Sequence, residues 1–159
     1  MYVVTKLKSQ VTTNNKTLKI CLGIKGELFT YWFSNFFLVD ICMNYQNLAD
    51  GTRKYDHITV NSKCDNTLTY GWYRFQGAAG TKMVTACPPV NRCDTTFPVW
   101  LNGDHPTMAE SKVTRQICIY RFGDCCDSSY TILVKRCSSY YIYRLFFLGV
   151  CNTRYCSTD

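Results

Sequence analysis

The sequence of 159 residues is poor in the groups that enzymes use for catalysis. It contains only two histidines, His57 and His105, and charged residues make up only 18% of the chain. It has no glycine-rich phosphate-binding loop, no His-Glu-x-x-His motif and no paired-carboxylate signature. The segment Asn102-Gly103-Asp104-His105-Pro106 is typical of a turn, which explains His105 without a catalytic role. We therefore predict no enzyme activity and no cofactor.

The sequence also lacks a hydrophobic run long enough to cross a bilayer as a helix. An aromatic run at residues 28–39 spans about a dozen residues, whereas a transmembrane helix needs about 20. Ser34 and Asn35 interrupt this run. It follows basic residues, as a signal peptide does, but it starts late and no small-residue cleavage site follows it. We expect no transmembrane span in this chain.

Residues 1–41 differ in composition from the rest of the chain. The first 25 residues are polar, rich in Thr, Asn and Lys, and contain a candidate N-glycosylation site at Asn15, in Asn15-Lys16-Thr17. We interpret residues 1–41 as an atypical N-terminal extension. Three explanations stay open: a degenerate signal peptide, a genuine core strand at residues 28–39, or a foreign segment from an incorrectly assigned gene start.

The net charge of +7 does not indicate nucleic-acid binding. Residues 1–41 hold five lysines against Glu27 and Asp40, which gives +3, and the remaining 13 basic and 9 acidic residues give +4. Basic residues that bind nucleic acid cluster on one face, but here they are scattered among acidic ones. We expect no nucleic-acid partner.

Cysteine is abundant, and its spacing separates the two parts of the chain. The sequence has 11 cysteines, a density typical of secreted domains held together by disulfides. Cys21 lies in the N-terminal extension, so it is the predicted unpaired thiol. The other ten predict five disulfides, whose pairing the spacing does not determine: Cys42, Cys64, Cys87, Cys93, Cys118, Cys125, Cys126, Cys137, Cys151 and Cys156.

The adjacent pair Cys125-Cys126 is informative because neighbouring residues of an extended chain point to opposite faces. The two thiols should therefore reach different partners. Zinc binding is the competing interpretation of a cysteine-rich sequence, and structural zinc sites favour Cys-x2-4-Cys spacings. The nearest spacings are Cys151-x4-Cys156 and Cys87-x5-Cys93, with no Cys-x2-Cys. We predict disulfides rather than a metal site.

Short aromatic and β-branched runs between turn residues predict a mainly β structure. The expected strands are residues 72–75, 116–120, 130–137 and 140–147, with a hairpin at Ser138-Ser139. Tyrosines crowd near this hairpin; we expect them to fill the core, with an exposed recognition surface as the alternative. The predicted fold is a small, disulfide-rich, mainly β domain with short strands, hairpins and little helix, spanning residues 42–156 as one crosslinked unit.

Several motifs in this region resemble one known family, the cysteine-rich domain of uromodulin and of the pancreatic zymogen-granule membrane glycoprotein. The resemblance covers Cys42 to Cys156, and it includes the Tyr140-Tyr141-Ile142-Tyr143 run and the Cys125-Cys126 pair. The family motif residues are Gly71, Trp72, Tyr73, Arg74, Phe75, Trp100, Leu101, Asn102, Gly103, His105 and Pro106.

The resemblance implies an extracellular β-rich module of the kind that lies beside EGF-like and zona-pellucida domains, neither of which this chain contains. In uromodulin such modules display glycans that capture bacterial adhesins. Here Arg144-Leu145-Phe146 replaces one expected sequon, and Asp104 removes another at Asn102. The glycan decoy mechanism is therefore not expected to transfer.

We derive three functional hypotheses. The first is a non-enzymatic, secreted interaction module that recognises an extracellular protein or glycan. The alternative is a structural spacer in a larger secreted or membrane-anchored glycoprotein. An intracellular zinc or thiol protein is the third, and it requires reduced cysteines.

Overall fold

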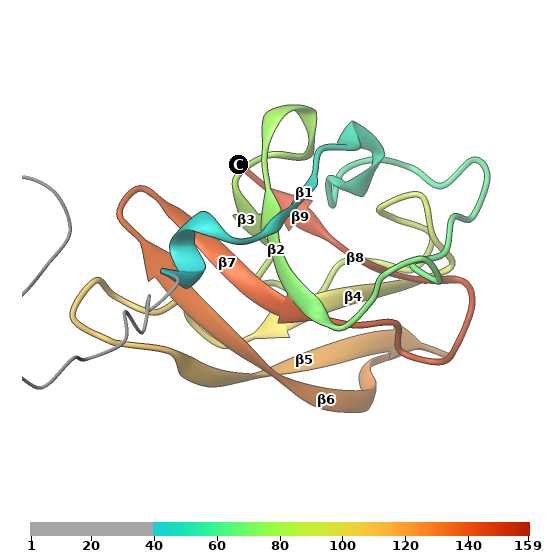
Figure 1. The fold of residues 1–159 in the computed structure, drawn as a ribbon. Helices are drawn as coiled ribbons and strands as arrows, with labels where there is room; N and C mark the ends of the chain where they lie inside the picture. The colour runs from blue at the N-terminus through green and yellow to red at the C-terminus, as the bar shows by residue number, and fades with distance from the viewer. Residues whose placement is uncertain (1–39) are drawn as a thin grey trace, which may run out of the picture. The chain divides into compact units, whose positions relative to one another are not determined.

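Residues 40–159 are described by a computed structural model, and they contain nine strands and three single-turn 3-10 helices (Figure 1). Asn15, Cys21 and the aromatic run at residues 28–39 lie outside the described residues. The strands are β1 (Gln46–Leu48), β2 (Gly71–Phe75), β3 (Lys82–Met83), β4 (Phe97–Asn102), β5 (Val113–Arg121), β6 (Asp124–Cys137), β7 (Tyr140–Leu145), β8 (Thr153–Tyr155) and β9 (Ser157–Thr158). The 3-10 helices are η1 (Ile41–Met43), η2 (Gly51–Arg53) and η3 (Gly77–Ala79).

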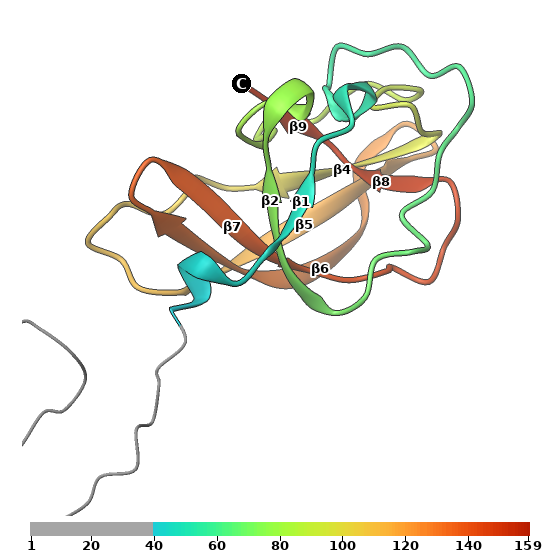
Figure 2. The same cartoon turned by 45° about the horizontal axis from the view of Figure 1, so that its top comes forward.

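Seven strands form one sheet in the order β1-β2-β7-β6-β5-β4-β8. The pairings from β2 to β4 are antiparallel, while the edge strands β1 and β8 pair in parallel with β2 and β4. Strands β3 and β9 form a separate two-stranded sheet, which lies beside the end of β2 in both views (Figures 1 and 2). The mainly β fold class predicted from the sequence is confirmed.

The two hairpins around β6 follow from local sequence. Ser138-Ser139 joins β6 to β7, with Cys137 paired to Tyr140 and a positive φ of 50° at Ser138. All four predicted strands exist, but β6 begins at Asp124 rather than Tyr130, because its polar first half pairs with β5. The prediction that the next strand reaches Phe147 is wrong, since β7 ends at Leu145.

The sheet curls so that its two ends share one core. Leu48 of β1, Tyr73 and Phe75 of β2, Val99 of β4 and Tyr155 of β8 belong to a single buried cluster. Strands at opposite ends of the sheet therefore pack their inner faces against each other, which a flat sheet does not allow. Alternate residues of each strand consequently point away from this core.

Five disulfides hold the described domain together: Cys42–Cys137, Cys64–Cys151, Cys87–Cys125, Cys93–Cys156 and Cys118–Cys126. Cys125 and Cys126 thus reach different partners, as their opposite orientations require. Four of the bridges join residues that are between 38 and 95 positions apart in sequence. They tie the loops at both ends of the domain to the sheet.

Candidate interaction surface

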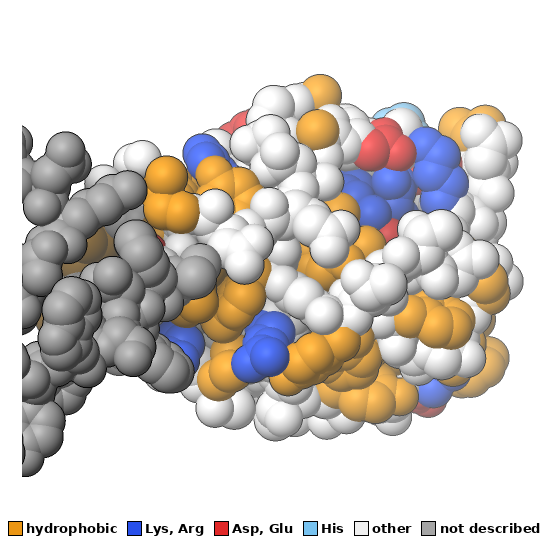
Figure 3. Space-filling view, viewed as in Figure 1, with side chains coloured by type: hydrophobic (Ala, Val, Ile, Leu, Met, Phe, Trp, Pro, Cys, Tyr) orange, Lys and Arg blue, Asp and Glu red, His pale blue; other side chains and the backbone are white. Residues whose placement is uncertain are grey.

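The outer face of β2 and β7 carries aromatic and arginine side chains. Tyr73 of β2 and Tyr143 of β7 are buried in the core, so their neighbours along each strand point outward. Trp72 and Arg144 are directly opposite each other across the two strands. With Tyr45, Tyr70, Arg74 and Tyr140 they form what we call the arginine–aromatic face. Figure 3 shows hydrophobic side chains with Lys and Arg between them on this side of the domain.

Arg144 lies against the exposed edge of this face. Its guanidinium carbon is 4.5 Å from the centre of the Tyr70 ring and 5.9 Å from that of Trp72. Tyr70 is 65% exposed, and its ring also contacts Phe146 at a centroid distance of 6.2 Å. Within residues 40–159, Arg144 forms no ion pair and no hydrogen bond, and its buried Nε has no acceptor. Cation–π contacts therefore replace the usual carboxylate partner.

Arg74 occupies a more enclosed position on the same face. Its guanidinium carbon lies 3.8 Å from the centre of the Tyr140 ring, and Nη1 donates a hydrogen bond to Tyr45 Oη at 2.9 Å. This hydrogen bond lowers the pKa of Tyr45, while burial raises the pKa of Tyr140. Tyr140 Oη donates to the carbonyl of Cys42 at 2.6 Å. These contacts make Arg74 part of the structure that joins β1 to β7.

The electrostatic character of this face is uniform. Strands β1, β2 and β7 contain Arg74 and Arg144 but no acidic residue. Lys135 of β6, which pairs with Ile142 of β7, points to the same side because its neighbour Val134 is in the core. The face is therefore positive as well as aromatic.

Other family motif residues have structural roles. Trp100 is buried against Cys93, Cys118 and Cys156, and its Nε1 donates to the carbonyl of Cys125 at 2.8 Å. Leu101 is in the core, and Pro106 is buried. Asn102 Nδ2 donates to Gln116 at 2.7 Å, and Gly103, with a φ of 136°, turns the chain after β4. These residues fix β4 and its following turn.

His105 is held between tyrosines. Its Nε2 lies 2.8 Å from Tyr143 Oη, and its ring centroid lies 4.5 Å from that of Tyr141. Tyr143 Oη also accepts a hydrogen bond from the backbone amide of Met83 at 3.0 Å. Burial, together with the charge of Lys82, lowers the pKa of His105 to about 4. A neutral, half-buried histidine therefore connects β7 to the segment after β4.

A buried ionic cluster lies on the other side of the domain, next to the Cys93–Cys156 disulfide. Arg53 forms two hydrogen bonds with Asp65, and Asp65 also accepts from the backbone amide of Tyr155 at 2.9 Å. Arg154 pairs with Asp50 at 2.7 Å. Burial raises the pKa of Asp50, but hydrogen bonds, led by the one from Lys63, outweigh it and bring the pKa well below its usual value.

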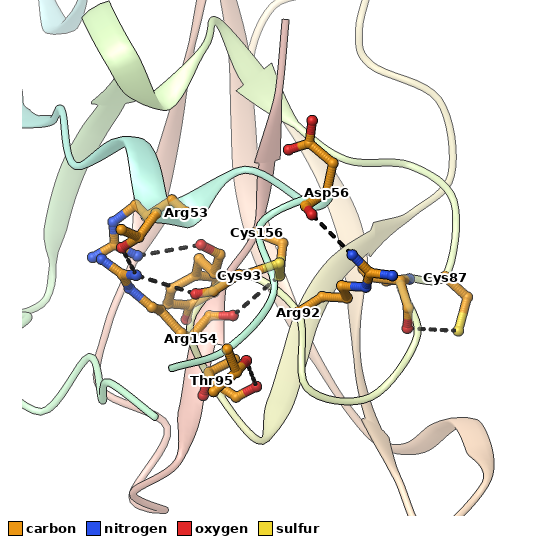
Figure 4. Close-up of a disulfide and its surroundings, with 12 residues drawn as sticks. Arg53, Asp56, Cys87, Arg92, Cys93, Thr95, Arg154 and Cys156 are labelled. Atoms are coloured by element: carbon orange, nitrogen blue, oxygen red, sulfur yellow. Dashed lines mark hydrogen bonds between the residues drawn. A yellow bond between two sulfur atoms is a disulfide. The ribbon is translucent and has the colours of Figure 1, made fainter. Parts of the chain in front are cut away.

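Figure 4 shows how this cluster and a neighbouring loop surround the disulfide. Arg154 donates to the carbonyl of Cys93 at 3.1 Å, while Arg92 donates to the carbonyl of Asp56 at 2.9 Å. All of these arginines have acceptors within the domain, in contrast to Arg144. The cluster is thus a structural unit that ties residues 50–65 to β8.

Zinc coordination by the ten cysteines is inconsistent with this structure. Zinc binds the deprotonated thiolate, whereas every cysteine from Cys42 to Cys156 is oxidised in a disulfide. Within residues 40–159, no group of three or more His, Cys, Asp or Glu side chains is arranged to hold a metal ion.

The fold and its disulfides define a crosslinked β domain, and comparison with known proteins identifies its family. The model of the uromodulin-like cysteine-rich domain matches residues 73–157, so the chain belongs to this family, as the motifs predicted. Pancreatic secretory granule membrane major glycoprotein GP2 is 40% identical in Canis lupus familiaris and 38% identical in Homo sapiens. Uromodulin of Mus musculus is 41% identical.

Each of these alignments covers 119 residues, or 74% of this chain. The chain spans only 23%, 22% and 18% of the lengths of these three relatives, in the same order. The similarity therefore concerns one domain of longer proteins, and the activities of those whole proteins are not carried over by it.

The sequence did not identify the arginine–aromatic face as a unit. Trp72, Arg74 and Tyr140 belong to family motifs or tyrosine-rich runs, but Tyr45 and Tyr70 lie outside every motif. Their proximity depends on the parallel pairing of β1 with β2 and on the loop before β2. The one available signal was alternation: outward positions of two aromatic strands both carry arginine.

Proposed function

We propose that residues 40–159 form a non-enzymatic, extracellular interaction module, which binds a protein or a glycan through the arginine–aromatic face. The observation that carries this proposal is Arg144, whose guanidinium contacts Tyr70 and Trp72 and has no acceptor within residues 40–159. Arginine and exposed aromatic residues are enriched at binding sites that dominate interface energies. Five disulfides and the name of the secretory granule membrane relatives support an extracellular location.

The test is capture of ligands by the oxidised full chain from extracellular fluid and from a glycan array. We expect at least one ligand whose capture is lost in the double variant Tyr70→Ser, Arg144→Ser. Arg121→Ser is the matched control, because Arg121 also contacts aromatic rings but is paired with Asp127. Capture that the double variant retains would contradict the proposal.

A structural spacer is the second candidate, because the chain corresponds to only 18–23% of its relatives' lengths. A spacer requires no ligand of its own. It predicts that the oxidised chain captures nothing in either assay, whereas the interaction module predicts capture that depends on Arg144.

A further inference from the structure

We infer that Arg144, Tyr70 and Trp72 form a binding site for the carboxylate of an acidic sugar, such as a sialic or uronic acid. This inference rests on the proposed interaction function and names its ligand class. The argument begins with the hydrogen-bonding state of Arg144. Among the arginines of residues 40–159, Arg144 alone donates no hydrogen bond to the domain; the others donate to carboxylates, carbonyls or hydroxyls.

Comparison with Arg121 shows that this state is not a general result of packing against aromatic rings. Arg121 lies 5.8 Å from the centre of the Phe97 ring and 5.9 Å from that of Phe122, yet its guanidinium is also 2.6 Å from Asp127. Arg144 has similar ring contacts and no carboxylate. A guanidinium presents a planar set of donors that matches a carboxylate in bidentate geometry. The missing partner of Arg144 therefore has the chemistry of a carboxylate.

The location of the site excludes recognition of a peptide by strand addition. Arg144 and Trp72 are on β7 and β2, which are interior strands of the sheet, each paired on both sides. A ligand at this position contacts side chains rather than free backbone groups. The edge strands where a peptide strand can add are β1 and β8.

The number of available cations favours a single acidic group. Recognition of acidic peptide motifs uses clusters of arginines, but the neighbouring Arg74 is stacked on Tyr140 and bonded to Tyr45. Arg144 is thus one unpaired charge beside the 65% exposed ring of Tyr70 and the half-buried ring of Trp72. A pyranose ring that bears one carboxylate matches this set, because its apolar C–H face packs on aromatic rings while its carboxylate accepts from arginine.

The experiment titrates the full oxidised chain with 3′-sialyllactose, a glucuronic-acid disaccharide and neutral lactose, and follows the indole and arginine side-chain NMR resonances. We expect saturable shifts of the Trp72 and Arg144 signals with at least one acidic sugar and none with lactose. The first two ligands distinguish a sialic-acid source from a uronic-acid source. Equal binding of lactose, or no binding of either acidic sugar, would overturn the inference.

Variants test the residue assignment. Arg144→Gln should weaken binding of the acidic sugar at least about tenfold, since a charge-assisted hydrogen bond is lost. Tyr70→Ala should also weaken it, whereas Arg121→Gln should bind as the parent chain does. An unchanged affinity in Arg144→Gln would overturn the site. If an acidic peptide shifts the same resonances and the sugars do not, the ligand class is wrong although the proposed interaction function stands.

Discussion

At the scale of single residues, Asp65 is the centre of the buried ionic cluster. It accepts hydrogen bonds from Arg53 and from the amide of Tyr155, and both arginine and aspartate side chains are less than 10% exposed. Removal of one member of a buried pair leaves the other charge uncompensated. The cluster therefore makes the loop at residues 50–65 dependent on a single carboxylate.

We predict that Asp65→Asn lowers the free energy of unfolding by about 3–5 kcal/mol, measured by chemical denaturation. Asp159→Asn is the control, because Asp159 pairs with Lys54 at the surface and is 75% exposed. Its removal should leave stability unchanged within error. Equal effects of the two variants would contradict the role assigned to Asp65.

His105 gives a prediction for pH dependence. Burial and the charge of Lys82 lower its folded-state pKa to about 4, from 6.5 in the unfolded chain; Arg115 acts in the same direction and Asp104 against it. Between these two values the unfolded state binds more protons, so stability falls as pH decreases from 6.5 towards 4. We expect His105→Gln to reduce this slope in unfolding measurements at several pH values. An identical slope in the variant would show that His105 is not responsible.

At the scale of structural elements, the β5–β6 hairpin has an unusual turn. Arg121 pairs with Asp124, and the two turn residues, Phe122 and Gly123, have φ values of 52° and 86°. Such two-residue turns favour asparagine and glycine, whereas a bulky residue at positive φ is strained. Phe122 is also 84% exposed, so little burial offsets this strain.

Phe122→Asn should therefore raise the free energy of unfolding by about 1 kcal/mol. Gly123→Ala should lower it by a similar amount, since it places a side chain at a φ of 86°. Thermal denaturation of both variants checks the signs. A loss of stability in Phe122→Asn would mean that the contact between Phe122 and Phe97 outweighs the backbone strain.

The same elements show how far the sequence predicts the fold. Strands joined by local turns are predictable, because Gly71, Gly123 and Ser138-Ser139 mark their ends. The parallel edge strands β1 and β8 and the β3–β9 pair are not, since each is only two or three residues long. Their pairing depends on segments distant in sequence, such as Phe97 with Thr153. Gly80 is a related case, because a Cβ there would lie 2.4 Å from the carbonyl oxygen of Thr158.

The candidate site is less predictable than the fold for a similar reason. Cysteine spacing predicts crosslinks without their pairing, and the tyrosine-rich run does not distinguish core from surface. Tyr143 is fully buried, while Tyr140 is half-buried on the outer face and contacts Arg74. Only the curl of the sheet and the register of β2 with β7 separate these roles.

At the scale of the whole molecule, disulfides and one shared core hold the described domain together. Cys42–Cys137 joins the start of the domain to the β6–β7 hairpin, and Cys64–Cys151 joins the long loop before β2 to the segment before β8. Crosslinks that close loops of 95 and 87 residues restrict the unfolded chain strongly. A rigid scaffold of this kind can present the arginine–aromatic face without ordering it at the moment of binding.

The central claim is an oxidised extracellular module, and the most direct measurement is a disulfide map of the chain secreted from eukaryotic cells. Alkylation without reduction, followed by proteolysis and mass spectrometry, should give five bridges: Cys42–Cys137, Cys64–Cys151, Cys87–Cys125, Cys93–Cys156 and Cys118–Cys126. Cys21 is the predicted alkylated residue. Several alkylated cysteines between Cys42 and Cys156, or a bridge between Cys125 and Cys126, would contradict the account.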